Sequence, residues 1–179
     1  MAKNILVISS SLRARSNSEA LADAFIEGAQ AAGNKVEKVM LKGKKLGFCL
    51  GCLSCVKTHK CVIKDDAVAI VEKMLHADVI AFATPVYYYE MSGQLKTMLD
   101  RANPLFTMDY AFRDIYVLTS AADNEKFTPE RTVSSITGWI DCFPKAKLAG
   151  SVFAGGVTEM GEITGHPALK EAYAMGKKA

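Results

Sequence analysis

Short apolar runs alternate with segments of helical periodicity along this chain, and that alternation restricts its fold more than any other feature. The first run, at 5–8, is continuously apolar, which is typical of a strand buried on both faces. The next segment repeats apolar residues at helical spacing, and both patterns recur to the end of the chain. Strands are predicted at 5–8, 36–41, 79–83, 115–118 and 148–154, and helices at about 18–33, 66–75, 95–102, 133–143 and 167–173.

Strands that alternate with helices need crossover connections, so they form a parallel sheet with helices on both faces. Polar or small residues interrupt the second and fifth strands, which predicts that these two lie at the edges. The strand order 2-1-3-4-5 of flavodoxin-like sheets places the same two strands at the edges. We therefore predict an α/β fold with a flavodoxin-like, doubly wound, five-stranded parallel sheet.

Neither a repeat nor a linker divides the chain, so residues 1–179 are expected to form a single domain. Within it, the stretch 42–64 has no strand or helix period and is predicted to be a long loop. The formal charge of +3 is too small to predict nucleic-acid binding, and no apolar run is long enough to span a bilayer. The first residues lack a secretory pattern, so a cytoplasmic location away from membranes is expected.

Ligands of doubly wound sheets bind beyond the carboxyl ends of the strands, beside the first and third strands. The segment 9–18 after the first strand holds five hydroxyls, one amide and two arginines, and no acidic residue. It leads into a helix N-terminus, which favours anions, so it is suited to a phosphate group. The alternative is that Ser16, Asn17 and Ser18 only cap the helix. Because the P-loop and G-x-G-x-x-G motifs are missing, a mononucleotide phosphate is the favoured ligand.

The loops after the third and fourth strands are expected to form two further walls of this site. Residues 84–92 contain Pro85 and three consecutive tyrosines at 87–89. Adjacent residues of a loop cannot all point inward, so at least one ring is expected to face a flat aromatic ligand. The alternative is that the rings pack against a partner subunit. Ser120, in the segment 119–123, is predicted to lie in the third wall.

Four cysteines, Cys49, Cys52, Cys55 and Cys61, lie within thirteen positions, and Cys142 stands apart. A reducing compartment disfavours a disulfide framework. The spacing is compact enough for one [4Fe–4S] cluster, which takes four thiolates, whereas zinc more often uses paired C-x-x-C motifs. Three alternatives stay open from the residues: a cluster, a zinc ion, or free or redox-active thiols.

As a set, the loops resemble the NAD(P)H-dependent FMN reductase and iron–sulfur flavoprotein group of flavodoxin-like proteins. The resemblance is strong over residues 4–105, although the family often has Gly where Ser10 stands. The matching stretches are Ser10–Arg13 with Ser16–Ser18, Cys61–Asp66, Ala77–Asp78, Thr84–Tyr87, and Ser92–Lys96 with Leu99–Arg101.

The resemblance implies that FMN is bound and that NAD(P)H is the co-substrate. The flavin then carries the chemistry, so no catalytic side chain is predicted and the three histidines are expected at the surface. Asp100 and Arg101 also match the family, but on a helix they are expected to form a structural ion pair. The predicted cofactor-binding residues are Ser9, Ser11, Arg13, Ser16, Asn17, Ser18, Thr84, Pro85, Val86, Tyr87, Tyr88 and Ser120.

The favoured function is an FMN-dependent NAD(P)H oxidoreductase that passes hydride to a flavin, a quinone or a similar small acceptor. One alternative is an iron–sulfur flavoprotein that carries electrons through FMN and a [4Fe–4S] cluster. Its metal ligands would be Cys49, Cys52, Cys55 and Cys61. The other alternative is a mononucleotide-binding module without redox activity. A homodimer or homotetramer is also expected, because the tyrosine loop and residues 105–106 would be costly to expose together.

Overall fold

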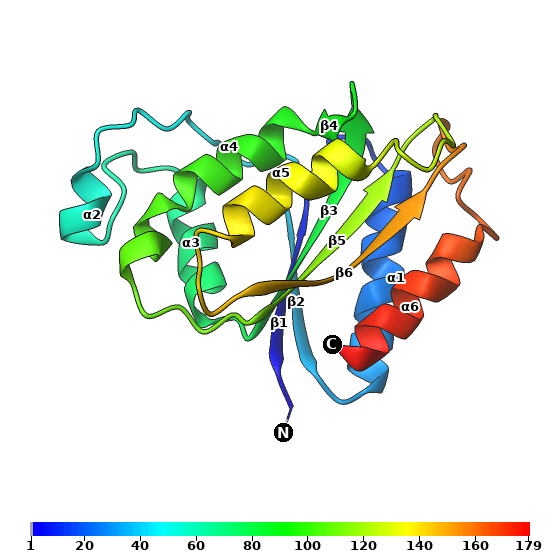
Figure 1. Cartoon of the computed structure of the whole chain (residues 1–179), viewed down its shortest axis with the longest axis horizontal. Helices are drawn as coiled ribbons and strands as arrows, with labels where there is room; N and C mark the ends of the chain where they lie inside the picture. The colour runs from blue at the N-terminus through cyan, green and yellow to red at the C-terminus, as the bar shows by residue number, and fades with distance from the viewer. Residues whose placement is uncertain (1) are drawn as a thin grey trace.

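A computed structural model describes residues 2–179 and shows a central sheet between two layers of helices (Figure 1). Among these residues, no helix is long and apolar enough to cross a membrane. The strands are β1 (Asn4–Ser9), β2 (Lys35–Met40), β3 (Val79–Tyr87), β4 (Glu90–Met91), β5 (Asp114–Ser120) and β6 (Lys147–Ala154). The helices are α1 (Asn17–Ala31), α2 (Ser54–Thr58), α3 (Asp66–His76), α4 (Gly93–Arg101), the 3₁₀ helix η1 (Asn103–Thr107), α5 (Glu130–Ile140) and α6 (Pro167–Lys178).

Five strands pair in parallel in the order β2-β1-β3-β5-β6, which confirms the predicted flavodoxin-like order. The two strands with diluted patterns, β2 and β6, lie at the edges. The sixth strand, β4, was missed by the five-strand prediction. It has only two residues and pairs antiparallel with the end of β3, too short to show a period.

Alternate residues of the central strands contribute to two separate cores. Along β1, Leu6 and Ile8 pack toward α3, α4 and α5, whereas Ile5 and Val7 pack toward α1 and α6. Figure 1 shows these two helix groups on opposite faces of the sheet. The continuous apolar run in β1 therefore reflects burial on both faces, as predicted.

Helices α1 and α6 approach each other closely enough for their backbones to touch. A methyl group added at Gly28 would lie 2.0 Å from the backbone oxygen of Tyr173. One added at Gly176 would lie 2.0 Å from the backbone oxygen of Phe25. Glycine is therefore required on both helices at this contact.

Two predicted loops contain regular structure. Residues 84–87, expected in a loop, extend β3, because β5 and β4 both pair with this part of the strand. The long loop 42–64 contains the five-residue helix α2, bounded by Leu53 and His59. Both of these residues have a φ of 57°, so left-handed backbone isolates this single turn.

Candidate functional site

A cavity of about 200 Å³ lies at the carboxyl ends of β1, β3 and β5, where the fold predicts a ligand. It gathers the segment after β1, the end of β3, the end of β5 with the residues after it, and the segment after β6. Its lining residues are Ser11, Arg13, Ser16, Asn17, Ser18, Pro85, Val86, Tyr87, Ser120, Ala121, Ala122, Val157 and Thr158.

The first wall is the N-terminus of α1 and the loop before it. Ser16 is the N-cap, and its hydroxyl accepts a hydrogen bond of 3.2 Å from the backbone N–H of Glu19. Ser18 is fully buried, and its Oγ has no hydrogen-bond partner within residues 2–179. A buried hydroxyl without a partner is costly, so its place in this cavity indicates a polar ligand. Ser16 therefore caps the helix and also lines the cavity, so the cap does not by itself exclude a ligand at this segment.

Arg13 and Asn17 connect this wall to the segment between β6 and α6. The Arg13 guanidinium Nη1 donates to the backbone oxygen of Thr158 at 2.8 Å. The Asn17 amide donates to the backbone oxygen of Glu159 at 3.0 Å and accepts from the backbone N–H of Ile163 at 3.3 Å. Both side chains are thus held at the cavity by contacts more than 140 positions away in sequence.

The segment 155–166 is a wall of the cavity that the sequence analysis missed. Glu162 folds it back on itself by accepting hydrogen bonds from the backbone N–H groups of Glu159 and Thr158. These bonds hold the pKa of the Glu162 carboxyl below its usual value. The available signal was its position, since this segment also follows the carboxyl end of a parallel strand.

Two predicted binding residues, Ser9 and Thr84, lie behind the cavity and do not line it. Ser9 is buried in β1, and its Oγ has no partner among the described residues. Thr84 accepts a hydrogen bond from the backbone N–H of Ser92 at 3.1 Å. The Ser92 hydroxyl in turn donates to the Ser10 hydroxyl at 2.8 Å. Ser10, where the family often has Gly, thereby connects the loop after β1 to the start of α4.

The third predicted residue outside the cavity is Tyr88, in the turn between β3 and β4. Tyr87 pairs with Glu90, so Tyr88 and Tyr89 form a two-residue hairpin turn with φ values of 52° and 66°. Two positive φ values define a type I′ turn, which normally uses Asn-Gly, and left-handed backbone costs bulky residues roughly 1–2 kcal/mol each. Tyr87 lines the cavity and is half exposed, whereas Tyr88 is fully exposed.

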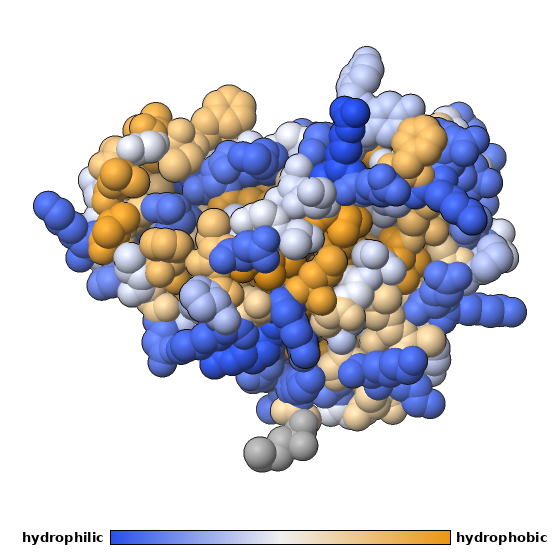
Figure 2. All heavy atoms as spheres, viewed as in Figure 1, coloured by the Kyte–Doolittle hydropathy of each residue, from blue (hydrophilic) through white to orange (hydrophobic). Residues whose placement is uncertain are grey.

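All five cysteines line a second cavity of about 470 Å³ under the loop 42–64. The fifth is Cys142, which the sequence left apart and which follows the end of α5. The loop also exposes apolar side chains, with Phe48, Leu50 and Leu53 each at least 65% exposed. Figure 2 shows apolar surface at the end of the molecule where Figure 1 places α2.

The thiols are not arranged as a metal centre. In the part of the chain that the structure describes, no three His, Cys, Asp or Glu side chains come together in a group that could hold a metal ion. Cys55 Sγ instead accepts a hydrogen bond from the Asn103 amide at 3.1 Å. Hydrogen bonds from the backbone N–H and hydroxyl of Ser54 hold the pKa of the Cys52 thiol below its ordinary value. The four thiols of the loop therefore line one cavity, but as placed in the described residues they do not form a group that could hold a metal ion.

A buried ion pair fixes both ends of the cysteine loop. Arg101, 1% exposed, donates to the two carboxylate oxygens of Asp65 at 2.6 and 2.8 Å. The same guanidinium donates to the backbone oxygens of Gly47 and Ile63, on either side of the cysteines. The predicted pair between Asp100 and Arg101 is therefore wrong. Asp100 pairs with Lys96, four residues earlier on the exposed face of α4.

The pKa values of Asp65 and Arg101 are shifted in the directions that favour their charged forms. Burial alone would raise the pKa of Asp65, but hydrogen bonds from Arg101 and from the backbone N–H groups of Gly47 and Ala67 outweigh it. The pKa of Asp65 is therefore below its usual value. The contact with Asp65 raises the pKa of Arg101, against the effect of burial. Both groups are charged near neutral pH.

The three histidines do not line the cavity at the carboxyl ends of β1, β3 and β5. His166 caps α6 by accepting from the backbone N–H of Ala168, and His59 contacts the Thr107 hydroxyl at 3.2 Å. His76 pairs with Glu72 at 3.0 Å.

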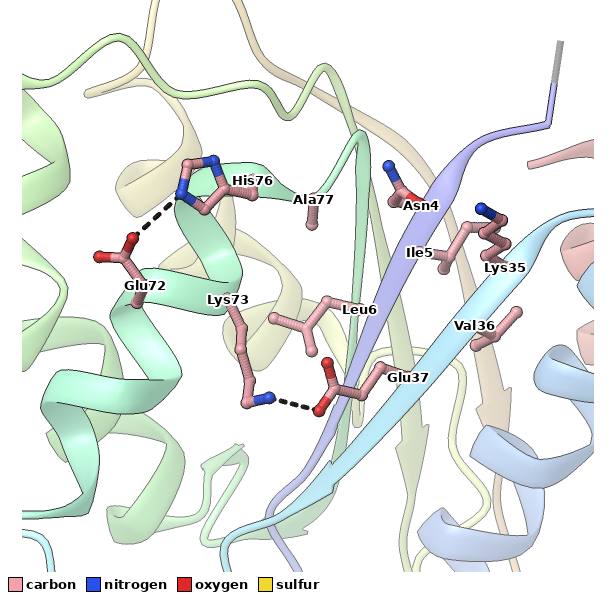
Figure 3. Close-up of a pocket in the computed structure, with 10 residues that line it drawn as sticks. All are labelled: Asn4, Ile5, Leu6, Lys35, Val36, Glu37, Glu72, Lys73, His76 and Ala77. Atoms are coloured by element: carbon pink, nitrogen blue, oxygen red, sulfur yellow. Dashed lines mark hydrogen bonds and ion pairs between the residues drawn. The ribbon is translucent and has the colours of Figure 1, made fainter.

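A further hollow, of about 450 Å³, lies where β1 and β2 begin and α3 ends (Figure 3). Figure 3 shows the ion pair between Lys73 and Glu37 and the contact between His76 and Glu72 along its rim. The hollow is at the amino ends of the strands, opposite the edge where doubly wound sheets bind ligands. The cavity at the carboxyl ends is therefore the candidate site.

Comparison with known proteins assigns the family. Residues 3–158 match the sequence pattern of the NADPH-dependent FMN reductase family. The chain belongs to this family. An NADPH-dependent FMN reductase is an oxidoreductase, so this family membership identifies the chain as an enzyme that carries out redox chemistry with FMN.

The relatives that match this chain include proteins named as iron–sulfur flavoproteins and one named as a putative NAD(P)H-dependent FMN-containing oxidoreductase. An iron-sulfur flavoprotein of Methanosarcina thermophila is 30% identical over 94% of this chain and 85% of its own length. An iron-sulfur flavoprotein of Methanocaldococcus jannaschii is 37% identical, over 56% of this chain and 52% of that protein. The NAD(P)H:quinone oxidoreductase of Methanothermobacter marburgensis has the same fold as this chain. It superposes with a TM-score of 0.78 at 19% identity over 99% of this chain and 96% of its own.

Proposed function

We propose that this protein is an FMN-dependent NAD(P)H oxidoreductase that reduces a small acceptor such as a quinone or a flavin. The observation that carries the proposal is the cavity at the carboxyl ends of the strands. It combines a helix N-terminus, an arginine and several hydroxyls with a strand end that carries Pro85, Val86 and Tyr87. One end is suited to a phosphate dianion and the other to a flat ring.

The residues present fit FMN. The partnerless, buried hydroxyl of Ser18 and the first backbone N–H groups of α1 would hold the phosphate, with Arg13 adding charge. Pro85, Val86 and Tyr87 would border the ring, and Ser120 would close the third side. When bound, FMN supplies hydride acceptance from the nicotinamide and donation to the acceptor. The protein binds and orients it, and no side chain of this chain is required as an acid, base or nucleophile.

An assembly of two or four copies in the cytoplasm is part of the proposal. The exposed apolar residues of the cysteine loop and Phe106, at 58% exposed, support it, because large apolar patches usually mark contact surfaces.

The test is steady-state oxidation of NADPH or NADH by the FMN-loaded protein, with ferricyanide and menadione as acceptors. Ping-pong kinetics are expected, because donor and acceptor must use the same exposed flavin face in turn. Absence of turnover with both nicotinamides, in protein whose bound flavin dithionite still reduces, would refute the proposal.

A second candidate is an iron–sulfur flavoprotein that carries electrons between an iron–sulfur cluster and FMN. The cysteine spacing and the names of the two archaeal relatives favour it. Anaerobic purification followed by iron analysis and an absorbance spectrum decides between the two. About four irons per chain and a broad brown absorption support the second candidate. A yellow, iron-free protein that oxidises NADPH supports the first.

A further inference from the structure

We propose that Cys61 is a modification site that forms mixed disulfides with small disulfides carrying a carboxylate. The inference does not depend on the FMN chemistry proposed above. Its starting point is another cavity, of about 550 Å³, between the end of the cysteine loop, α3 and η1. Of the five cysteines, all in the described part of the chain, Cys61 alone lines both this cavity and the 470 Å³ cavity under the loop.

The lining of this cavity includes a buried hydrogen-bond donor that the fold leaves unused. A guanidinium has five N–H groups. The Nη1 and Nη2 groups of Arg101 donate to Asp65 and to two backbone oxygens at the ends of the loop. Its Nε has no hydrogen-bond partner in the described residues, although Arg101 is only 1% exposed. A buried donor without a partner is costly, so a ligand that accepts from it is favoured.

The Cys61 thiol lies beside this donor. Asp65 is the first cause of the raised pKa of Arg101, and a hydrogen bond with the Cys61 sulfur is a further cause. Cys61 is half-buried, so a small reagent can reach its sulfur. A carboxylate that accepts from Arg101 would therefore hold the rest of its molecule close to a thiol.

The charges around the cavity favour an anion at this end. Lys60 is exposed, lines the cavity and precedes the thiol directly in sequence. Of the two carboxylates in the lining, Asp65 is paired with Arg101. The other, Glu72, contacts His76 at 3.0 Å. Lys60 can thus pair with a carboxylate of the ligand, while apolar residues of α3 and η1, among them Val71, Leu75 and Pro104, can contact its carbon chain.

The reaction is a thiol–disulfide exchange. In its thiolate form, Cys61 attacks one sulfur of the bound disulfide, so that one S–S bond breaks and another forms. One half of the reagent stays on Cys61, and the other half leaves as a thiolate. The proton lost by Cys61 ends on this leaving group by way of water. The Cys61 sulfur is oxidised and the leaving sulfur is reduced, so the disulfide itself is the oxidant.

The test compares three reagents that share the S–S group and differ in charge. Dithiodipropionate carries two carboxylates, hydroxyethyl disulfide is neutral, and cystamine carries two ammonium groups. Each is added to the protein as purified anaerobically with its cofactors, and peptide mass spectrometry measures the rates of modification at Cys61 and Cys142. The exposed Cys142 is the internal reference, because it does not line the 550 Å³ cavity. We expect the ratio of the dithiodipropionate rate to the cystamine rate to be at least roughly 5-fold higher at Cys61, with hydroxyethyl disulfide between the two.

Two variants separate the cavity from the general charge of the loop. Lys60→Gln removes the positive charge that lines the cavity. Lys57→Gln is the matched control, since it removes the same charge from α2, where the side chain lines neither cavity. We expect the preference of Cys61 for dithiodipropionate to fall roughly 3- to 5-fold in Lys60→Gln and to stay near wild type in Lys57→Gln.

Three results would overturn the inference. Equal rate ratios at Cys61 and Cys142 would show that the cavity does not select a carboxylate. Equal effects of the two substitutions would assign the preference to the overall charge of the loop. About four irons per chain, with Cys61 unreactive until they are chelated, would make Cys61 a metal ligand instead. NADPH oxidation enters none of these measurements, so a failure of the proposed function is seen separately.

Discussion

Replacing Asp65 with Asn tests whether the buried ion pair stabilises the fold and the cysteine loop together. The substitution keeps the side-chain shape but leaves the buried Arg101 without a counter-charge. Breaking a buried pair in this way costs roughly 3–5 kcal/mol. Because the Asn oxygen can still accept one hydrogen bond, we expect a loss of about 3 kcal/mol, the lower end of that range.

Urea denaturation followed by circular dichroism measures this loss, which corresponds to a midpoint shift of at least about 1 M. Asp100→Asn is the matched control, since Asp100 pairs with Lys96 on the exposed face of the same helix as Arg101. We expect the control to lose no more than about 0.5 kcal/mol. In Asp65→Asn, the thiols of the loop should also react faster with Ellman's reagent, because both ends of the loop are released.

The effect should depend on pH in a defined direction. The pKa of Asp65 is lowered in the folded protein, so its contribution is complete above the ordinary Asp value of about 3.9. It is lost as the pH falls through the lowered folded value. The difference between wild type and Asp65→Asn should therefore be full at pH 7 and shrink below about pH 3.9. A loss at pH 7 no larger than that of the control, or one unchanged at pH 3, would refute the reasoning.

Three further predictions follow from the other contacts. Arg13→Ala should weaken FMN affinity about 10- to 100-fold in a flavin-fluorescence titration, because a charge-assisted contact with the phosphate is lost. Arg15→Ala, at an exposed position, should leave FMN affinity unchanged. Equal effects of the two substitutions would place the phosphate elsewhere. Gly28→Ala should lower the melting temperature or prevent folding, because the new methyl group would lie 2.0 Å from the backbone of α6. Gly138→Ala, where a methyl group would face open space outside its own helix, should be neutral or stabilising by up to about 1 kcal/mol. Similar melting temperatures for both variants would contradict the α1–α6 contact. Cys52→Ser should leave FMN binding and turnover nearly unchanged if the exposed thiol is free. If wild-type protein purified anaerobically holds iron and the Cys52→Ser variant does not, a cluster is supported instead.

The parts of the fold that follow from local patterns could be predicted from the sequence. The apolar run at 5–8 predicts a strand buried on both faces, and Ser16 marks the start of α1. Both features depend only on residues close together in the sequence. Chain topology then places the segments after the strands at one edge of the sheet. That is why nine of the twelve predicted residues, among them Ser11, Arg13 and Pro85, line one cavity.

The missed features depend on partners that are distant in sequence or on unusual residues. Arg101 pairs with Asp65, 36 positions away, and the neighbouring Asp100 gave no sign of this. The contact of Arg13 with Thr158 spans 145 positions. The hairpin turn at Tyr88 and Tyr89 lacks the Asn-Gly signal of its turn type, so tertiary bracing by α5 overrides local preference.

The contact between α1 and α6 also bears on the order in which the protein matures. Helix α1 is made well before α6, and the backbone it packs against belongs to α6, which follows every other element of the described residues. The segment 155–166, which holds Arg13 and Asn17, is made just before α6. A nascent chain therefore carries the first wall of its cavity long before the last wall and the supporting helix exist. Such pairing of chain ends slows folding, because the loop-closure entropy must be lost before the contact is gained. The first wall of the cavity can therefore reach its folded form only after the segment 155–166 and α6 have been made.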